Sequence, residues 1–491
     1  MIEHPRQRHP AVAAFLSFLF PGLGQAYAGN RRLAVLLALP VLALIVTGII
    51  ATALGGRQAL NSLLSASFLT ALVLLDLALM GWRLFAIAQV GFAPVPAAGQ
   101  AALAAGPMGA GELTVARRGG TILLVVVLLV TTIGMHAWAG LLVGQLNRTL
   151  GDVFSGSGGV SRSGGGGGPL NLPDYSWDGN ERINFLLLGI DRGGQRTSEL
   201  TDTILVVSID PVGRTGVLVS VPRDTAFVPL PDRSVYADGL YPNKINALST
   251  EARDNPELWC PDMPVEDADA CGLRSLQRSV GLYLGIPIHY YATLDLEGFT
   301  AMIDAVGGLN LCLPGKLVDD TYTGPGDTWD HRRGVILEAG CRHYNGQRAL
   351  AFARARKGYM EMRDGTRVQL DDFKRAERQQ KVLLELRREF AQLDLFFELP
   401  QMLDAIGSTV ATDFPRAEAG DLGSLLPLIT APDIERVVLD LPDFVDPPAD
   451  PNVNYILTPR RDEVRAEMER LFGADYLEGW YVATTETGPE S

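Results

Sequence analysis

Three long apolar stretches near the N-terminus constrain the fold of this chain more than any other feature. They cover residues 33–54, 63–87 and 121–144, and each is close to or above the ~20 residues that cross a bilayer as a helix. A further apolar stretch, residues 11–28, is interrupted by Pro21-Gly22-Leu23-Gly24-Gln25, so we expect an interfacial or re-entrant segment there. The sequence therefore predicts an N-terminal α-helical transmembrane module.

Basic residues beside these stretches predict their orientation. By the positive-inside rule, the cytoplasmic side holds Arg31, Arg32, Arg83, Arg117 and Arg118. Three spans then place everything after the last span outside the cell, in a multi-pass protein of the cell membrane. No small-residue cleavage site follows a single short apolar region, so we expect no cleavable signal peptide.

The chain divides into six predicted parts. A Gly/Ser-rich run marks a flexible tether after the last span, and a soluble domain follows it. The predicted boundaries are a membrane module at 1–92, a cytoplasmic linker at 93–120, a transmembrane anchor at 121–144, the tether at 145–180, an α/β domain at 181–475 and a C-terminal tail at 476–491.

One carboxylate, Asp76, falls inside the second apolar stretch. Ionisable groups are expensive in a bilayer, and they mark either a functional site or an interhelical hydrogen bond. We favour the hydrogen bond and keep the functional site as the alternative.

Charge is distributed unevenly along the chain. Residues 1–150 hold nine Lys/Arg and three Asp/Glu, a net +6, whereas the remaining residues hold 33 and 53, a net −20. Binding of nucleic acid without sequence preference depends on neutralising phosphates. The acidic outer part therefore predicts no nucleic-acid partner.

Cysteine usage agrees with an outer location for the second part. All four cysteines lie there, at Cys260, Cys271, Cys312 and Cys341. No C-x-x-C spacing is present, so we expect neither a zinc site nor a thioredoxin-like site. Two disulfides are the simplest interpretation. Three pairings are possible, and the one we predict joins Cys260 to Cys271 and Cys312 to Cys341.

Short apolar runs predict buried strands at residues 184–190, 203–209 and 216–221. Charged residues border all three runs, as Asp191-Arg192, Asp202 and Arg223-Asp224. In an open α/β sheet, ligands bind at strand ends. We therefore expect these charged groups to meet at one edge of a sheet.

A second charged cluster follows, on a predicted strand or turn and then a helix. It contains Arg354, Arg356, Asp372, Arg375 and Gln379. Each guanidinium holds two phosphate oxygens at once and stays charged, so this density of arginines suits a phosphate-rich ligand. The spacing of the last three residues places them on one helix face. A solvated basic helix face is the alternative.

Seven motifs occur in order in the outer domain. They are LLGID (187–191), LTDTILVVSID (200–210), SVPRDT (220–225), KIN (244–246), DLEGFTAMIDAVGGL (295–309), NGQRALAFARAR (345–356) and DFKRAERQQ (372–380). Together they resemble the LytR-CpsA-Psr family, strongly over residues 181–390 and in part as far as Phe472. The resemblance implies an extracytoplasmic α/β/α sandwich behind the membrane module.

The same resemblance implies an activity in cell-wall assembly. Proteins of this kind are phosphotransferases that move a glycopolymer from a polyprenyl-pyrophosphate carrier onto peptidoglycan, with Mg²⁺ as cofactor. A polyprenyl-pyrophosphate phosphatase, or a lipid-binding protein without ligase activity, is the alternative. A membrane-bound transcriptional regulator is less expected, because the outer part is acidic and faces away from the cytoplasm.

Roles for single residues also come from the resemblance. It implies that Asp191 and Asp202 hold the metal, as a hard cation prefers carboxylate oxygens. The implied pyrophosphate-binding residues are Arg192, Arg196, Arg223, Lys244, Arg354, Arg356, Arg375, Arg378 and Gln379. The implied catalytic residues are Arg223, Asp224, Arg354, Arg356, Asp372 and Arg375.

Several assignments carry alternatives. The family often has Arg where this chain has Leu200, so Arg196 is the expected substitute, with the absence of one phosphate contact as the alternative. Asp224 is the candidate general base, with a structural cap or ion-pair partner as the alternative. Helices near 276–284, 299–306 and 383–390 are the candidate wall of a lipid channel, with ordinary core as the alternative. The outer histidines His289, His331 and His343 are interpreted as structural or surface groups.

Overall fold

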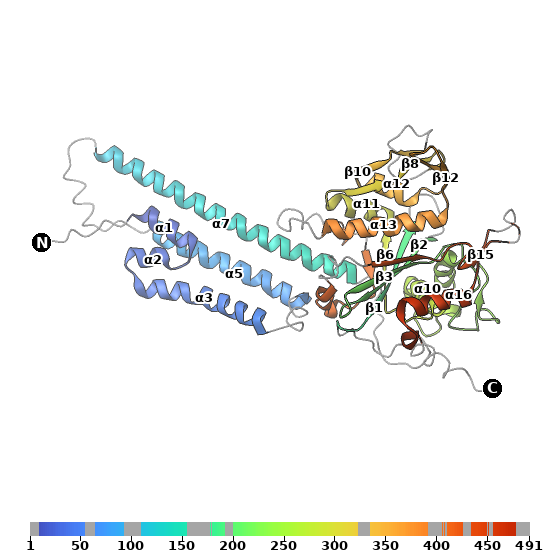
Figure 1. Cartoon of the computed structure of the whole chain (residues 1–491). Coiled ribbons are helices and arrows are strands. Elements are labelled where there is room, and N and C mark those ends of the chain that lie inside the picture. Colours follow the sequence, from blue (N-terminus) through green and yellow to red (C-terminus); the bar gives the residue numbers. More distant parts are fainter. Residues whose placement is uncertain are drawn as a thin grey trace. The chain divides into compact units, whose positions relative to one another are not determined.

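The structure is a computed structural model, and it describes residues 9–54, 64–92, 110–154, 177, 179–191, 200–322, 334–390, 405, 407, 410–425, 434–448, 450 and 455–477. The chain forms two compact units, residues 1–147 and 148–491 (Figure 1). The first contains apolar helices, and the second contains the β-sheets and the charged motifs.

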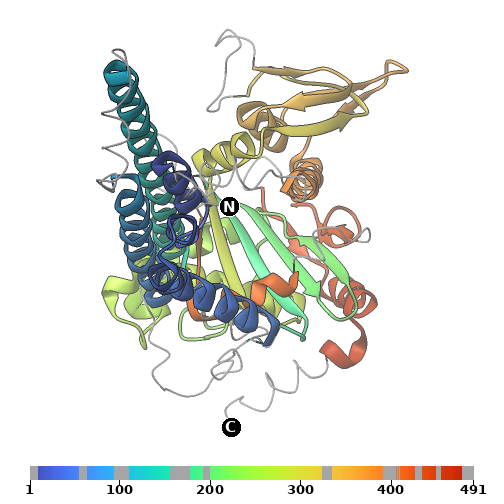
Figure 2. The same ribbon diagram turned by 90° about the vertical axis from the view of Figure 1, so that its left-hand side faces the viewer.

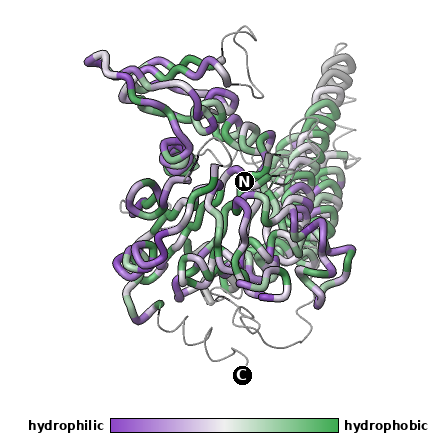
Figure 3. Tube along the Cα trace, turned by 90° about the vertical axis from the view of Figure 1, so that its right-hand side faces the viewer, coloured by the Kyte–Doolittle hydropathy of each residue, from purple (hydrophilic) through white to green (hydrophobic). Residues whose placement is uncertain are grey.

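The first unit is helical. Its elements are α1 (Pro10–Leu19), α2 (Leu23–Ala28), α3 (Arg31–Leu54), α5 (Ala66–Gly91) and most of α7 (Ala110–Phe154). Among the described helices, α3, α5 and α7 are long and apolar enough to cross a membrane, and hydrophobic colouring dominates this unit in Figure 3. Helix α1 has only ten residues, and Gly22, with φ of 100°, begins a new direction before α2. The predicted interruption of this stretch is confirmed.

Helix α7 is longer than the predicted span at residues 121–144. It begins inside the predicted linker and runs into the predicted tether, so residues 110–120 and 145–154 are helical rather than loop. Extending an existing helix gains a hydrogen bond per residue without a new nucleation step. The flanks also supply Ala, Leu, Arg and Gln, which favour helix. The helix therefore extends into both neighbouring predicted segments.

The second unit is built on a mixed β-sheet. In the described part of the chain this sheet has six strands, in the order β13 (Val410–Thr412), β6 (Tyr290–Asp295), β1 (Ile183–Asp191), β2 (Leu200–Asp210), β3 (Thr215–Ser220) and β14 (Ile434–Val438). The three predicted runs fall in β1, β2 and β3, which pair antiparallel. Strand β6 lies parallel to β1, and β14 parallel to β3. The end of β1, the start of β2 and the end of β3 therefore share one edge.

One face of this sheet packs against α8 (Leu248–Asp254), α10 (Ala268–Leu284) and α16 (Arg461–Phe472) (Figure 1). Side chains alternate between the faces of a strand, so every second residue of β1 to β3 projects toward these helices. The buried cluster contains Leu186, Leu188, Ile204, Val206, Val217 and Val219, with Leu276, Val280 and Met468 from the helices. Each fully buried aliphatic side chain contributes roughly 1.5–3 kcal/mol. The helix at 276–284 is thus ordinary core, the alternative given for it above.

The opposite face of the sheet meets a smaller lobe (Figure 2). Its helices are α11 (Leu296–Ala305), α12 (Gly346–Arg354) and α13 (Asp372–Phe390). Its strands are β7 (Leu309–Leu313), β8 (Gly315–Asp319), β9 (Val335–Leu337), β10 (Gly340–Tyr344), β11 (Tyr359–Met362) and β12 (Arg367–Gln369). These elements enclose a second core around Ile303, Leu317, Phe352 and Val382. Helices cover both faces as predicted, but the second layer carries strands of its own, which a plain α/β/α sandwich does not have.

Short elements complete the second unit. They are β4 (Val228–Pro229), β5 (Leu240–Tyr241), α9 (Pro256–Trp259), β15 (Val445–Asp446), β16 (Thr458–Pro459) and 3₁₀ turns at Ile245–Ala247, Val265–Asp267, Arg416–Glu418 and Asp421–Leu425.

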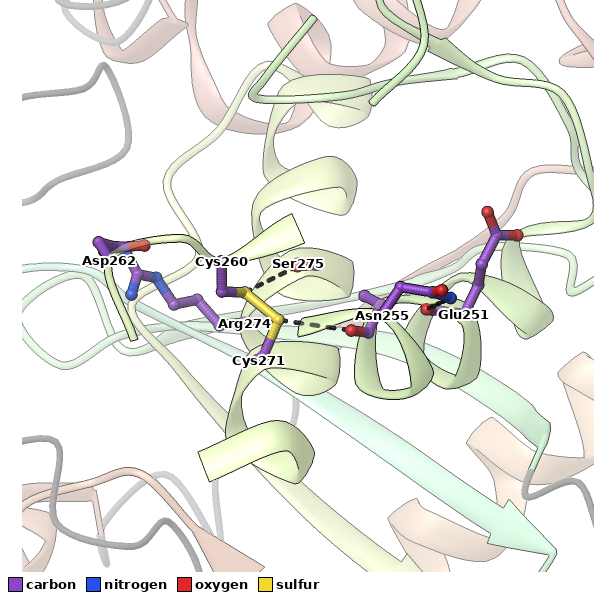
Figure 4. Close-up of a disulfide and its surroundings, with 8 residues drawn as sticks. Glu251, Asn255, Cys260, Asp262, Cys271, Arg274 and Ser275 are labelled. Atoms are coloured by element: carbon purple, nitrogen blue, oxygen red, sulfur yellow. Dashed lines mark hydrogen bonds and ion pairs between the residues drawn. A yellow bond between two sulfur atoms is a disulfide. The ribbon is translucent and has the colours of Figure 1, made fainter. Parts of the chain in front are cut away.

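Both predicted disulfides are confirmed. Cys260 follows α9 and bonds to Cys271 in the first turn of α10, with their Cα atoms 5.9 Å apart (Figure 4). Cys312 of β7 bonds to Cys341, its direct partner on β10. Each bridge therefore links elements that also pack together, the first at the core helices and the second in the smaller lobe.

Candidate functional site

A β-bulge aims Asp202 at the sheet edge where the charged strand ends meet. On β1, Gly189 pairs with Thr203 while the next residue, Ile190, pairs with Thr201, so Asp202 has no partner opposite it. A bulge redirects its side chain and frees its backbone groups from the ladder. Both effects are used, because the carboxylate and the carbonyl oxygen of Asp202 each bind a different arginine.

Arg223 binds the redirected carboxylate from the loop that follows β3. Its Nη1 donates to Asp202 Oδ1 at 2.6 Å, and its Nε lies 3.6 Å from Asp372 Oδ1 and 3.7 Å from Asp224 Oδ2. Burial acts to lower the pKa of Arg223, but the carboxylates of Asp372 and Asp202 outweigh burial and raise it. This guanidinium is therefore held as a cation among three carboxylates.

The N-terminus of α13 supplies the other half of the cluster. Asp371 begins the helix by accepting the amide of Lys374 at 2.7 Å. One turn on, Arg375 Nη1 lies 2.9 Å from Asp372 Oδ1, and its Nη2 donates to the carbonyl oxygen freed at Asp202 at 3.1 Å. Burial lowers the pKa of Arg375. The predicted meeting of the two charged clusters is thus confirmed.

Lys244 completes the network and clarifies Asp224. Its Nζ donates to Asp224 Oδ1 at 2.7 Å, and the backbone oxygen of Asp224 accepts the amide of Leu457 at 2.9 Å. Asp224 is only 5% exposed, so this pairing occupies one carboxylate oxygen in a place where solvent has little access. The contacts favour the ion-pair alternative for Asp224 over a general base.

Arg354 is the last residue of α12 and Arg356 lies in the turn that follows, which two buried side chains hold. Arg378 donates from Nε to the Phe352 carbonyl at 2.8 Å and from Nη2 to the Ala355 carbonyl, at the C-terminal end of the helix. It is 6% exposed, and burial lowers its pKa to about 10. Arg378 was expected to bind pyrophosphate, but the donors described here serve backbone oxygens that the helix end leaves without partners.

Asp319 of β8 holds the same turn from the other side. Its Oδ2 accepts the amides of Arg356 and Lys357, each at 3.0 Å. Its Oδ1 accepts from Thr321, by the amide at 3.1 Å and by the hydroxyl at 2.9 Å. Sequence reasoning missed this residue, because an Asp in an acidic pair at a strand end gives no signal for a partner about 37 residues away.

Two further residues escaped the sequence analysis. Gln380, next to the predicted Gln379, donates from Nε2 to Ser220 Oγ and to the Val437 carbonyl, both at 2.9 Å, and so ties α13 to β3 and β14. A polar residue on the helix stripe that faces the core was the available signal. Tyr455 lies with its ring centroid 5.9 Å from Lys244 Nζ. Burial raises the pKa of its phenol, and nearby carboxylates add to the effect.

Part of the predicted site lies outside the described residues. Arg192 and Arg196 fall there, as does the side chain of Asp191, whose backbone ends β1 opposite Leu200. In the ranges that the structure describes, no group of three or more His, Cys, Asp or Glu is placed to hold a metal ion. The metal assignment therefore stays a prediction.

Comparison with known proteins places this arrangement in a family. A sequence profile described as the LytR_cpsA_psr family matches residues 167–465. The chain belongs to this family. The LytR_cpsA_psr region contains the whole ion-pair network and begins after the end of α7 at Phe154, so the membrane helices lie outside it.

Individual LytR_cpsA_psr relatives are similar at low identity. The polyisoprenyl-teichoic acid–peptidoglycan teichoic acid transferase TagV of Bacillus subtilis is 24% identical over 62% of this chain and 67% of its own length. A TagU of Halalkalibacterium halodurans is 24% identical over 47% of this chain and 60% of its own length. The regulatory protein MsrR of Staphylococcus aureus is 29% identical over 48% and 57%. A crystal structure of B. subtilis TagV aligns with a TM-score of 0.43 at 23% identity, over 61% of this chain and 98% of that one.

Proposed function

We propose that this protein is a membrane-anchored phosphotransferase that moves a glycopolymer from a polyprenyl-pyrophosphate carrier onto peptidoglycan outside the cell. The observation that carries the proposal is the cluster of Arg223, Arg375 and Lys244 around three carboxylates at one sheet edge. The names of the TagV and TagU relatives describe the same class of transfer. The long apolar helices supply a membrane anchor.

The arginines supply the electrostatics that phosphoryl transfer requires. In the network, the Nε atoms of Arg223 and Arg375 are buried donors that lack a hydrogen-bond acceptor among the described residues. Unsatisfied buried donors are costly, and a phosphate oxygen of the ligand would satisfy them. Arginines fixed in this way stabilise charge on the pyrophosphate without reorganising during the reaction. We assign Arg354, the last residue of α12, and Arg356, in the turn that Arg378 and Asp319 hold, to the same ligand.

Mg²⁺ is the cofactor that we propose for this site. Asp191 ends β1, and Asp202 stands on the neighbouring strand two residues beyond the partner of Asp191. Mg²⁺ is commonly bound by one or two carboxylates together with substrate phosphates, so these two residues would hold it. The ion supplies charge neutralisation on the pyrophosphate. Asp202 already shares one oxygen with Arg223, which keeps the carboxylate oriented.

An apolar surface beside the network suits the lipid chain. Leu187, Val207 and Leu294 lie on the face of the sheet that meets the smaller lobe, and they are half-buried in the described part of the chain. Phe299 of α11 and Leu383 of α13 are half-buried as well. We propose that the polyprenyl chain lies against these half-buried side chains, and the two helices were both predicted as channel walls.

The test reconstitutes the full-length chain in lipid vesicles with a polyprenyl-pyrophosphate glycan, Mg²⁺ and peptidoglycan oligomers. Arg375→Lys should lower ligation by about 100-fold or more, in the range seen when one transition-state donor is lost. The matched control is Arg388→Lys, because Arg388 lies on the same helix and pairs with Glu385 at 3.2 Å on an exposed surface. Thermal unfolding of both variants separates loss of function from loss of fold.

Three results would overturn the proposal. Release of phosphate without ligation would support a phosphatase. Full activity in excess chelator would remove the metal assignment. Specific DNA binding at physiological salt would favour a regulator, the class that the name of MsrR describes.

A further inference from the structure

A buried Asp–His pair joins two of the long helices in the first unit. His136 Nδ1 of α7 lies 2.7 Å from Asp76 Oδ1 of α5, a hydrogen-bond distance. The side chains are 10% and 20% exposed, respectively. The predicted interhelical hydrogen bond of Asp76 is confirmed, and its partner is an ionisable residue.

Each member of the pair has a second polar atom that takes no part in this hydrogen bond. Asp76 Oδ2 and His136 Nε2 are buried, and neither has a hydrogen-bond partner among the described residues. Gly140, one turn from His136, lies over Asp76 Oδ2 and has no side chain to cover it; a Cβ there would be 3.7 Å from that oxygen. A bond that served only to join helices would not need two orphaned atoms on its outer sides.

The pair sits near the middle of both helices. At 1.5 Å per residue, Asp76 is about 15 Å from the start of α5 and about 22 Å from its end. His136 is about 25 Å from Gly119 and about 27 Å from the end of α7. A bilayer core is about 30 Å thick, so neither short side chain reaches the headgroups. In helix α5 the other charged residue is Arg83, which donates to the Phe18 carbonyl.

The cost of charge in a bilayer determines the protonation of the pair. Between Arg118 and Arg148, His136 is the sole titratable residue of α7, and α3 carries charge only at Arg31 and Arg32, where it begins. With no counter-charge nearby in these described helices, the favoured state has zero net charge. That state holds two exchangeable protons, one inside the Oδ1–Nδ1 hydrogen bond and one on either Nε2 or Oδ2.

In the state of zero net charge, one of the two atoms Asp76 Oδ2 and His136 Nε2 therefore carries a proton and is a donor, and the other is an acceptor. We propose that Asp76 and His136 form a proton-exchange site within the membrane module, whose ligand is a proton delivered by water and released to water. A proton that binds Oδ2 while the Nε2 proton leaves, with the central proton ending on Nδ1, keeps the net charge at zero. One proton enters and one departs, and no bond between heavy atoms changes.

The test uses the full-length chain in lipid nanodiscs. Infrared spectra recorded in H₂O and in D₂O should contain a carboxyl band that shifts on deuteration and disappears in Asp76→Asn. Asparagine still accepts a hydrogen bond from His136, so the variant keeps the helix contact while losing the exchangeable proton. The matched control is Thr132→Val, which removes a buried hydroxyl one turn from His136 that bonds within its own helix at 2.8 Å. Its spectrum should equal that of the parent chain.

A second measurement needs no substitution. In ¹⁵N-histidine-labelled parent chain, the Nε2 proton of His136 should exchange with water at constant pH. An Nε2 proton that does not exchange with water while the chain remains folded would overturn the proposal. So would a carboxyl band that persists unchanged in Asp76→Asn, since the pair would then be a structural hydrogen bond only.

Discussion

Asp319→Asn tests how the arginine turn is held in place. Asp319 is 2% exposed, and its two oxygens accept four hydrogen bonds at 2.9–3.1 Å. Asparagine replaces one oxygen with an NH₂ group, which cannot accept, so one side of the carboxylate loses its bonds in either orientation. A hydrogen bond to a charged group contributes about 1.5–3 kcal/mol. Two such bonds at the lower limit amount to about 3 kcal/mol.

The assay is hydrogen exchange of the full-length chain, read from peptides that contain Arg356 and Lys357. A peptide that contains Thr321 is followed as well, because the orientation of the asparagine decides whether Arg356 and Lys357 or Thr321 loses its acceptor. A local loss of about 3 kcal/mol corresponds to roughly 100-fold faster exchange of the amides on that side, because each 1.36 kcal/mol is a factor of ten. Asp320→Asn is the matched control, since Asp320 is the exposed neighbour on the same strand end. The proposed glycopolymer transfer should fall in parallel, because the turn that carries Arg356 loses this support. Unchanged protection in Asp319→Asn would refute the reasoning.

Three further predictions follow from single contacts. Replacing Cys260 and Cys271 with alanine should lower the free energy of unfolding by about 3 kcal/mol, since the bridge closes a loop of separation 11; reductant should shift the thermal midpoint of the parent but not of the variant. Burial lowers the pKa of His289 to about 4, so the contribution of neutral His289 to the free energy of unfolding should be full above about pH 6.5. It should fall toward pH 4 by at most about 1.4 kcal/mol per pH unit. His289→Gln should flatten this slope in denaturant titrations. Lys244→Met should cost about 2 kcal/mol, because Asp224 Oδ1 loses the cation that binds it at 2.7 Å while Arg223 Nε stays 3.7 Å from Oδ2, and Lys244→Arg should restore most of it; equal stability of the two variants would contradict this.

The sheet edge was predictable because local patterns decide it. Short apolar runs flanked by charge place Asp202 and Arg223 at strand ends, and the helix spacing places Asp372 and Arg375 on one face. The ion pairs between these groups confirm both patterns. The cysteine pairing was predictable for a similar reason, because each bridge joins neighbours along the chain.

Tertiary packing decided what the sequence did not reveal. Arg378 and Arg375 look alike in sequence, but only the position of the α12 end directs Arg378 toward backbone carbonyls. Gln379 and Gln380 are adjacent in sequence, but it is Gln380 that bonds to Ser220 of β3 and Val437 of β14. Which of the two glutamines makes these bonds depends on where the two strands lie relative to α13. The strands of the smaller lobe are short and partly exposed, so they lack the continuous apolar signal of β1 to β3.

The bulge at Asp202 shifts the register of β2 against β1 by one residue. Side chains on either side of it follow the two-residue alternation of a strand, but the two alternations are out of step. Removing one residue there would bring them back into step and would turn the retained side chain toward the opposite face. If Asp202 were the residue retained, its carboxylate would then point at the aliphatic core instead of the charged network. The deletion could have this effect without removing any charged residue. The register of this hairpin, and not only the identity of its residues, is therefore a determinant of activity.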